Sequence, residues 1–236
     1  MGLKTQSGEP CFPILLKLGK REHLEMLRTG TLYMNTLAYF NKLEADAARS
    51  DPYEGTDSIL QPQHVGHFII EPRVPGLIPH RIDPKDLAGP IRIARNRTSA
   101  CNVFCMFSIT KLMVGPVFSE SCEWFVDHFV LFTNTPEFLN RVARAAEREG
   151  LGFQCGMVEY YGESEYSGQT GRFRKRSCFA YQREYRIAVE PGLEGPRRLE
   201  IGDLTDITSE VIPRSLADEV LKFSPEDAIA ARLIWQ

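Results

Sequence analysis

Polar side chains occupy one face of a strand-like run at residues 179–189, and this face limits what the chain can fold into. In a β-strand, side chains alternate between two faces, so Gln182, Glu184 and Arg186 lie on the same side. The other side is formed by Tyr181, Arg183, Tyr185 and Ile187, which are mostly large residues. Because buried polar groups are costly without partners, we expect either a solvated edge strand or the wall of a cleft.

Hydrophobic periodicity indicates a strand-rich chain with few helices. It predicts strands at residues 12–18, 31–34, 65–70, 102–109, 125–133, 153–160, 177–189 and 199–201, and helices at 19–30 and 134–149. The strands cluster instead of alternating with helices, which is typical of α+β domains. Residues 72–98 are rich in Pro, Gly and Arg and predict an extended insertion or lid. With 236 residues, 43% of them hydrophobic, and no dividing linker, we expect a single α+β domain over residues 1–236.

The composition argues against several classes of protein. A net charge of −3 is unlike that of a protein that coats nucleic acid with its whole surface. The six cysteines and five histidines show no zinc-site spacing, so we assign neither a metal nor a disulfide. No signal-peptide core and no run of about 18 apolar residues is present, so we expect a cytoplasmic protein that makes no membrane contact. Rossmann, P-loop and G-x-S-x-G motifs are also missing.

Three segments resemble, in the right order, the motifs of ADP-ribosyltransferase folds. Those folds carry a basic or histidine residue on the first strand, a Ser/Thr-containing strand in the middle and a catalytic Glu late in the chain. Lys17 occupies the first position, and Ser108 and Thr110 lie in the segment that resembles the middle strand. Gln182 and Glu184 match the Q-x-E form of the last motif. The resemblance implies a single strand-rich domain with a split-sheet ADP-ribosyltransferase-like core and a few peripheral helices.

The chain is also similar to a widespread group of uncharacterised bacterial proteins. These carry a Phe-Asn-Asp-Pro-Phe-Glu segment, a Cys-Phe-Ser strand and a late Glu-x-Glu-x-Arg motif. The first segment is split here into Phe40-Asn41 and Asp51-Pro52-Tyr53-Glu54, with an insertion between the two parts. The last motif appears here as Gln182-Arg183-Glu184-Tyr185-Arg186.

The resemblance implies NAD as the substrate and assigns a role to each matching residue. Breaking the bond between nicotinamide and ribose builds positive charge on the ribose, as glycoside cleavage does. Glu184 would stabilise that charge in the transition state, and Gln182 would orient the acceptor by hydrogen bonds. The implied NAD-binding residues are Lys17, Tyr33, Asn35, Ser108 and Thr110. Lys17 would hold a phosphate or ribose oxygen, while Ser108 and Thr110 would fix the nicotinamide end.

Basic residues also gather in two places, at Arg92, Arg95 and Arg97 and at residues 172–176. Each cluster could be a solvated loop, and together they would suit a phosphate-bearing ligand. The predicted substrate-binding residues are Arg172, Arg174, Arg176 and Arg186. Because Phe173 lies among closely spaced cations just before the proposed catalytic strand, the acceptor could be single-stranded nucleic acid, although an acidic protein would also be attracted.

Three classes of function therefore stay open. The first is an NAD-dependent ADP-ribosyltransferase that modifies nucleic acid or protein, as a toxin or phage-defence effector with an antitoxin or regulatory partner would. The second is a non-catalytic module that binds a nucleotide or RNA. The third is a metal-dependent nuclease that uses Asp51, Glu54 and Glu184. Consumption of NAD separates the first class from the others, and dependence on added Mg²⁺ separates the third.

Overall fold

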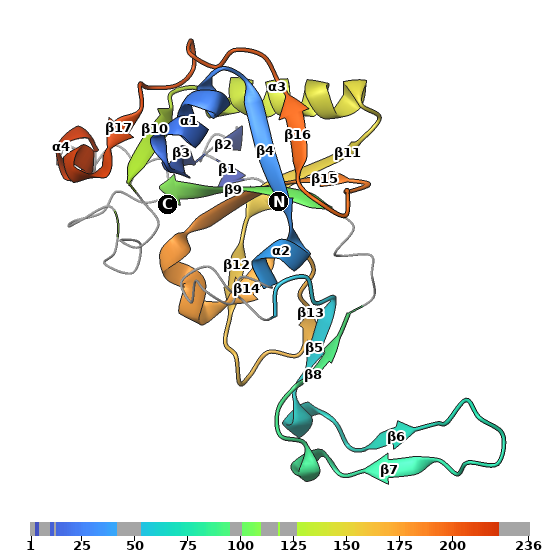
Figure 1. Cartoon of the computed structure of the whole chain (residues 1–236). Helices are drawn as coiled ribbons and strands as arrows, with labels where there is room; N and C mark the ends of the chain where they lie inside the picture. The colour runs from blue at the N-terminus through green and yellow to red at the C-terminus, as the bar shows by residue number, and fades with distance from the viewer. Residues whose placement is uncertain are drawn as a thin grey trace.

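The computed structural model describes residues 3–4, 10–11, 13–41, 53–94, 101–109, 118 and 127–221. They form a mixed α+β fold in which strands predominate (Figure 1). None of the described helices is long and apolar enough to cross a membrane.

The centre of the fold is an eight-stranded sheet. Its main path runs β11-β15-β9-β3-β10-β17, and β4 joins it through β9 and carries β16 on its other side. The paired neighbours in this sheet are antiparallel. The bounds are β3 (Ile14–Gly19), β4 (Thr31–Thr36), β9 (Asn102–Ile109), β10 (His128–Phe132), β11 (Gly152–Met157), β15 (Glu184–Glu190), β16 (Arg197–Glu200) and β17 (Ile212–Pro213).

The sheet divides along one edge of β9. On the other edge, β15 pairs with residues 102–107 of β9. On the divided edge, β4 pairs with residues 102–103 and β3 pairs with residues 107–109. The strands β3 and β4 are joined by the helix α1 (Arg21–Arg28) and diverge over the residues of β9 between the two paired segments. This divergence opens the space in which the candidate site lies.

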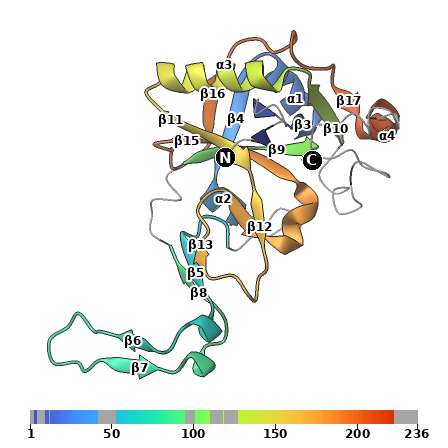
Figure 2. The same cartoon turned by 180° about the vertical axis from the view of Figure 1, so that it is seen from behind.

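The helix α3 holds the central sheet through its apolar face, and a tight turn follows α1. In α3 (Thr135–Arg148), Phe138 and Val142 are fully buried in the main core, and the helix packs against β11 and β16 (Figure 2). The side chain of Asn134 caps α3 by accepting a hydrogen bond from the backbone N–H of Glu137 at 3.1 Å. After α1 the chain turns at Gly30, where φ is 105° and a side chain would clash with the backbone of Gly202.

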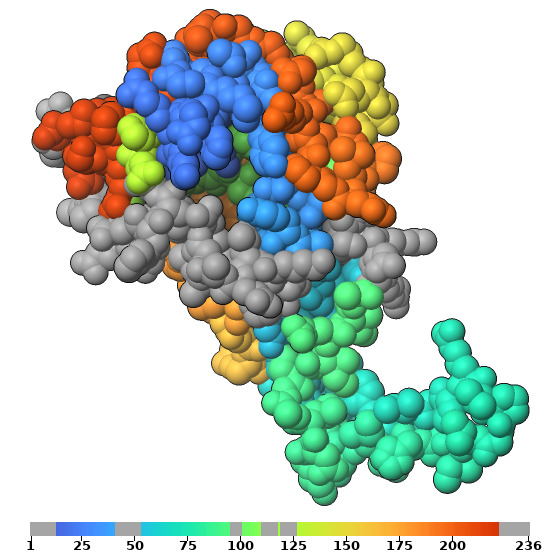
Figure 3. All heavy atoms as spheres, viewed as in Figure 1, coloured from blue at the N-terminus to red at the C-terminus, as the bar shows by residue number. Residues whose placement is uncertain are grey.

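Two smaller sheets lie below the central sheet in the view of Figure 1. They are β5 (Ser58–Leu60), β8 (Ile91–Ile93) and β13 (Gly168–Gln169) in one sheet, and β12 (Glu159–Tyr161) parallel to β14 (Arg174–Arg176) in another. The hairpin β6 (Phe68–Ile70) and β7 (His80–Ile82), flanked by η1 (Pro62–His64) and η2 (Pro84–Asp86), projects far from the body (Figure 3). The predicted insertion at 72–98 overlaps this arm only as far as η2, and residues 95–98 lie outside the described part of the chain.

The remaining elements are short. They are β1 (Leu3–Lys4), β2 (Pro10–Cys11), α2 (Leu37–Asn41), η4 (Ser177–Gln182), η5 (Arg214–Leu216) and α4 (Ala217–Val220).

The predicted strand at 177–189 is wrong over its first half. Residues 177–182 form the 3₁₀ helix η4, and Arg183 follows in the left-handed region with φ of 41°. The strand β15 begins only at Glu184 and lies between β9 and β11, so it is not an edge strand. Gln182 therefore does not share a strand face with Glu184, and the position of its side chain has another cause, given below.

Candidate functional site

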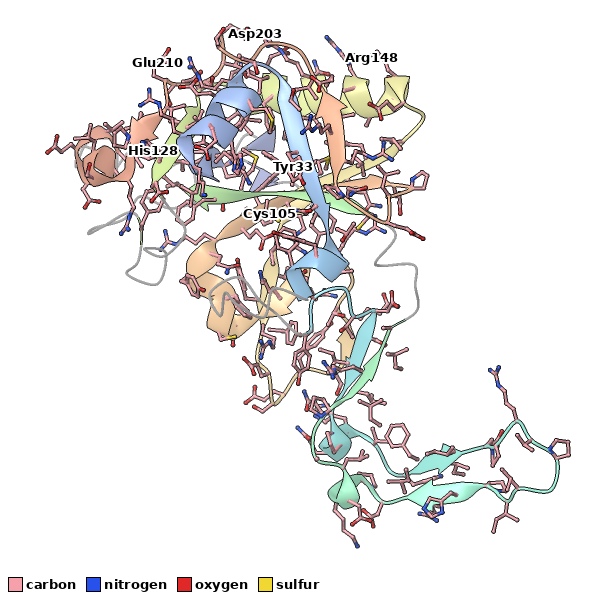
Figure 4. The ribbon with its side chains drawn as sticks, viewed as in Figure 1. Tyr33, Cys105, His128, Arg148, Asp203 and Glu210 are labelled. Atoms are coloured by element: carbon pink, nitrogen blue, oxygen red, sulfur yellow. The ribbon has the colours of Figure 1, made fainter. Side chains whose placement is uncertain are left out.

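A cleft of about 730 Å³ opens where β3 and β4 diverge from β9. Its walls come from β3, α1, β4, β9 and β15, and from the segments that carry Glu54 and Lys175. Figure 4 labels Tyr33 and Cys105, which line the cleft from β4 and β9. Gln182, Glu184 and Arg186 all line it as well, which favours the cleft wall over the solvated edge strand, although the three residues do not share one strand face.

Glu184 is held at the wall of this cleft as a carboxylate. It is 5% exposed, and its Oε1 accepts a hydrogen bond from Nε of Arg186 at 2.7 Å. Nζ of Lys175 lies 3.5 Å from Oε2. Burial alone would raise the pKa of Glu184, but the charges of Arg186 and Lys175 outweigh burial and lower the pKa to about 2. Glu184 is therefore ionised at neutral pH.

Two neutral groups complete the surroundings of Glu184. The backbone N–H of Glu184 donates to the hydroxyl oxygen of Tyr160 at 2.8 Å. The thiol of Cys105 hydrogen-bonds to the Glu184 carboxylate and stays protonated, because burial raises its pKa to about 12. The Tyr160 contact fixes the backbone of Glu184 and the Cys105 contact fixes its carboxylate, and neither adds charge.

Arg186 links Glu184 to Glu54. The guanidinium is 1% exposed, and its Nη1 donates to Oε1 of Glu54 at 2.8 Å and to the carbonyl oxygen of Arg172. Arg186 was predicted to bind substrate, but in this structure its donors are directed to two carboxylates and a carbonyl of the chain itself. Arg186 thus holds the two glutamates together by hydrogen bonds to both.

Lys175 completes this buried cluster, and sequence reasoning missed it. Its Nζ donates to Oε1 of Gln182 at 2.9 Å and lies 3.5 Å from Oε2 of Glu54. The contact with Lys175 explains why Gln182 lies beside Glu184 without sharing its strand. Alternation within β14 directs Lys175 away from Arg174 and Arg176, which is a signal that the sequence offered.

The predicted NAD-binding residues of β3 and β4 do line the cleft. They are Lys17, Tyr33 and Asn35. Nζ of Lys17 donates to the carbonyl oxygen of Cys105 at 2.6 Å and lies 4.3 Å from the centre of the Phe104 ring. This contact places the lysine charge at the unpaired stretch of β9, inside the division of the sheet.

Ser108 lies outside the cleft lining, and Thr110 lies outside the described residues. Ser108 is fully buried, and its hydroxyl donates to the carbonyl oxygen of Arg183 at 2.7 Å. It lies where β9 pairs with β3, beyond the divided stretch. Ser108 therefore supports the turn that precedes Glu184.

The basic run at 172–176 is not a solvated loop. Part of it is the strand β14, and ion pairs join Arg172 to Glu190, Arg174 to Glu159 and Arg176 to Glu163 at 2.8, 2.8 and 3.2 Å. Of the second predicted cluster, Arg92 lies 5.0 Å from the Tyr53 ring, while Arg95 and Arg97 lie outside the described residues. The charges of the run at 172–176 are thus largely balanced within the fold.

Other basic groups at the cleft were not predicted. Lys20 and His23 come from the start of α1, and Arg198 comes from β16. All three are exposed, and the described part of the chain gives none of them an ion-pair partner. Within the same residues, no group of three or more His, Cys, Asp or Glu side chains is placed to hold a metal ion.

The site as a whole is a cleft with an ionised glutamate in its wall, a lysine at the division of the sheet and exposed basic groups among its lining residues. Comparison with known proteins adds no family to this description. No protein-family model, no curated protein and no solved structure matches the chain.

Proposed function

We propose that the chain is an ADP-ribosyltransferase with a split-sheet core of that kind, and that it uses NAD as its substrate. The observation that carries the proposal is the position of Glu184. It is ionised, and it lines a cleft formed where the central sheet divides. A fixed negative charge at such a place suits a reaction that develops positive charge on a bound sugar.

The cleft has the size and the groups that NAD requires. A volume of about 730 Å³ lies within the range of small-molecule sites. Lys20 and Arg198 supply positive charge for a pyrophosphate, and the ring of His23 offers a further polar contact. Tyr33 and Tyr39 also line the cleft and offer aromatic faces for the rings of the dinucleotide.

In the proposed reaction, the bond between the nicotinamide nitrogen and C1′ of the ribose breaks, and its electron pair leaves with nicotinamide. Glu184 stabilises the positive charge that develops on the ribose. A lone pair of the acceptor then forms the new bond to C1′, and the proton of the acceptor passes to solvent. Gln182 contributes hydrogen bonds that orient the acceptor, and Lys17 holds a phosphate or ribose oxygen.

A non-catalytic nucleotide-binding module is the second candidate, and one observation favours it. Both oxygens of Glu184 already face cations of the chain, Arg186 at 2.7 Å and Lys175 at 3.5 Å. Such a carboxylate could serve the fold alone. The same cations oppose the nuclease candidate, because they would repel a divalent metal approaching Glu54 and Glu184. Asp51, the third residue predicted for the nuclease, lies outside the described residues.

The test is to incubate the protein with NAD labelled in its adenylate half, together with separate pools of RNA, DNA and protein. The proposal predicts release of nicotinamide and transfer of label to one pool, both without added Mg²⁺. Binding of NAD without release of nicotinamide would support the binding module. Degradation of a nucleic-acid pool only when Mg²⁺ is added would support the nuclease.

A further inference from the structure

We infer that Lys175 is a positioning residue that holds Glu184 and Gln182 in a single arrangement at the cleft. The catalytic meaning of this inference rests on the proposed transferase function. The structural part of the inference does not depend on that function, because the effect of Lys175 on Glu184 can be measured without any substrate.

The contacts of Lys175 carry the inference. Its side chain is 6% exposed, and its Nζ lies 2.9 Å from Oε1 of Gln182 and 3.5 Å from Oε2 of Glu184. The ammonium also lies 4.9 Å from the centre of the Phe179 ring, within η4. One buried cation therefore contacts both the strand that carries Glu184 and the 3₁₀ helix that carries Gln182.

The hydrogen bond to Lys175 also sets the orientation of the Gln182 amide. An ammonium group only donates hydrogen bonds, so the amide atom that faces it must be the oxygen. The amide nitrogen of Gln182 is consequently on the other side of the group. Loss of Lys175 would remove this restraint on the Gln182 amide.

The charges around Glu184 show what Lys175 adds. Arg186 approaches from the same strand and Lys175 from β14, while Glu54 is the second carboxylate of the cluster. The neutral groups that face Glu184 are Cys105 from β9 and Tyr160 from β12. The four charged side chains balance, with two positive and two negative charges. Without Lys175, two carboxylates would share a single guanidinium, so Glu184 would bind a proton more readily.

The variant that tests the inference is Lys175→Met, with Arg174→Met as the matched control. Arg174 is the adjacent residue of β14 and pairs with Glu159, away from the cluster. The first measurement is the titration of Glu184 by NMR of protein labelled with ¹³C at the glutamate carboxyl groups. Lys175→Met should raise the pKa of Glu184, whereas Arg174→Met should leave it unchanged.

The second measurement is the release of nicotinamide from NAD across a range of pH. Lys175→Met should lower kcat on the order of 10-fold to 100-fold with little change in KM, because two groups lose their alignment. The acidic limb of its pH profile should move to higher pH, and Lys175→Arg should recover part of kcat. A lysine that only stabilised the fold would leave kcat and the pH profile of the folded variant unchanged.

The outcomes separate this inference from the proposed function. If the parent protein releases no nicotinamide, the transferase proposal fails, while the titration still decides whether Lys175 sets the state of Glu184. If Glu184 titrates identically with and without Lys175, the inference is overturned. Should Lys175→Met not fold, the double variant Lys175→Met with Glu54→Gln restores the charge balance and permits the kinetic measurement, with Glu54→Gln alone as its reference. An unaltered kcat in the double variant would likewise overturn the inference.

Discussion

Replacing Arg186 with Met should destabilise the protein strongly at neutral pH. The guanidinium is 1% exposed and contacts Glu184 at 2.7 Å and Glu54 at 2.8 Å. Methionine fills much of the same volume but supplies no charge and no donor. Both carboxylates would remain buried with only Lys175 to oppose them, and breaking such a buried pair costs roughly 3–5 kcal/mol.

The pKa of Glu184 leads to a similar magnitude. A fall from the ordinary 4.5 to about 2 corresponds to a stabilisation of about 3 kcal/mol when the carboxyl group is ionised in both folded and unfolded chains. This contribution is fully present above the ordinary pKa and is lost as the pH falls through the folded pKa, because the unfolded chain then binds the proton first. Arg186 is the largest cause of the lowered pKa of Glu184. The loss of unfolding free energy in Arg186→Met should therefore be greatest near pH 7 and should shrink in acid.

Urea denaturation at several pH values checks this prediction. In thermal melts at pH 7, the loss of about 3–5 kcal/mol should lower the melting temperature by about 6–20 °C, since each kcal/mol shifts a chain of this size by about 2–4 °C. Arg21→Met is the matched surface control, because Arg21 and Glu25 are exposed and lie 3.8 Å apart. The reasoning is refuted if Arg186→Met unfolds within about 1 kcal/mol of the parent protein at pH 7.

Other predictions concern the cleft. Lys17→Met should weaken NAD binding about 10-fold while leaving the fold intact, as calorimetry and circular dichroism would show; unchanged affinity would place Lys17 outside the site. Lys20→Glu together with Arg198→Glu should raise the Kd for NAD about 10-fold or more and lessen its salt dependence. Arg21→Glu, next to Lys20 but outside the cleft lining, should change the Kd little. Adding Glu54→Gln to Arg186→Met should recover part of the lost stability, and strictly additive losses would argue against a shared cluster.

Strong local signals predicted much of the scaffold. The strand at 102–109 was found with its expected bounds because its run of apolar residues is continuous. The helix α3 was predicted to within a residue at each end, since Asn134 and Pro136 mark its start and Gly150 follows it. These elements are determined by residues close to one another in the chain.

Contacts between residues far apart in the sequence determine where β15 begins and which side chains form the buried cluster. The run at 179–189 alternates like a strand, yet Arg183 adopts a left-handed conformation and its carbonyl oxygen accepts hydrogen bonds from Ser108. Lys175 lies in a basic run that reads as a loop, but its charge is buried because Glu54 approaches from far away in the sequence. Alternation within β14 indicates that Lys175 faces away from its basic neighbours, but periodicity does not identify its partners. Neither the start of β15 nor the composition of the buried cluster could therefore be predicted.

The proposal that Glu184 serves catalysis can be tested most directly by measuring nicotinamide release by Glu184→Gln. This change keeps the shape of the side chain and removes the charge, and folding is checked by circular dichroism and by retained NAD binding. Glu163→Gln is the control, because Glu163 is an exposed carboxylate that also pairs with an arginine, Arg176. We predict a loss of roughly 10²-fold or more for Glu184→Gln and near-parental release for Glu163→Gln. Near-parental release by a folded Glu184→Gln variant would contradict the proposal.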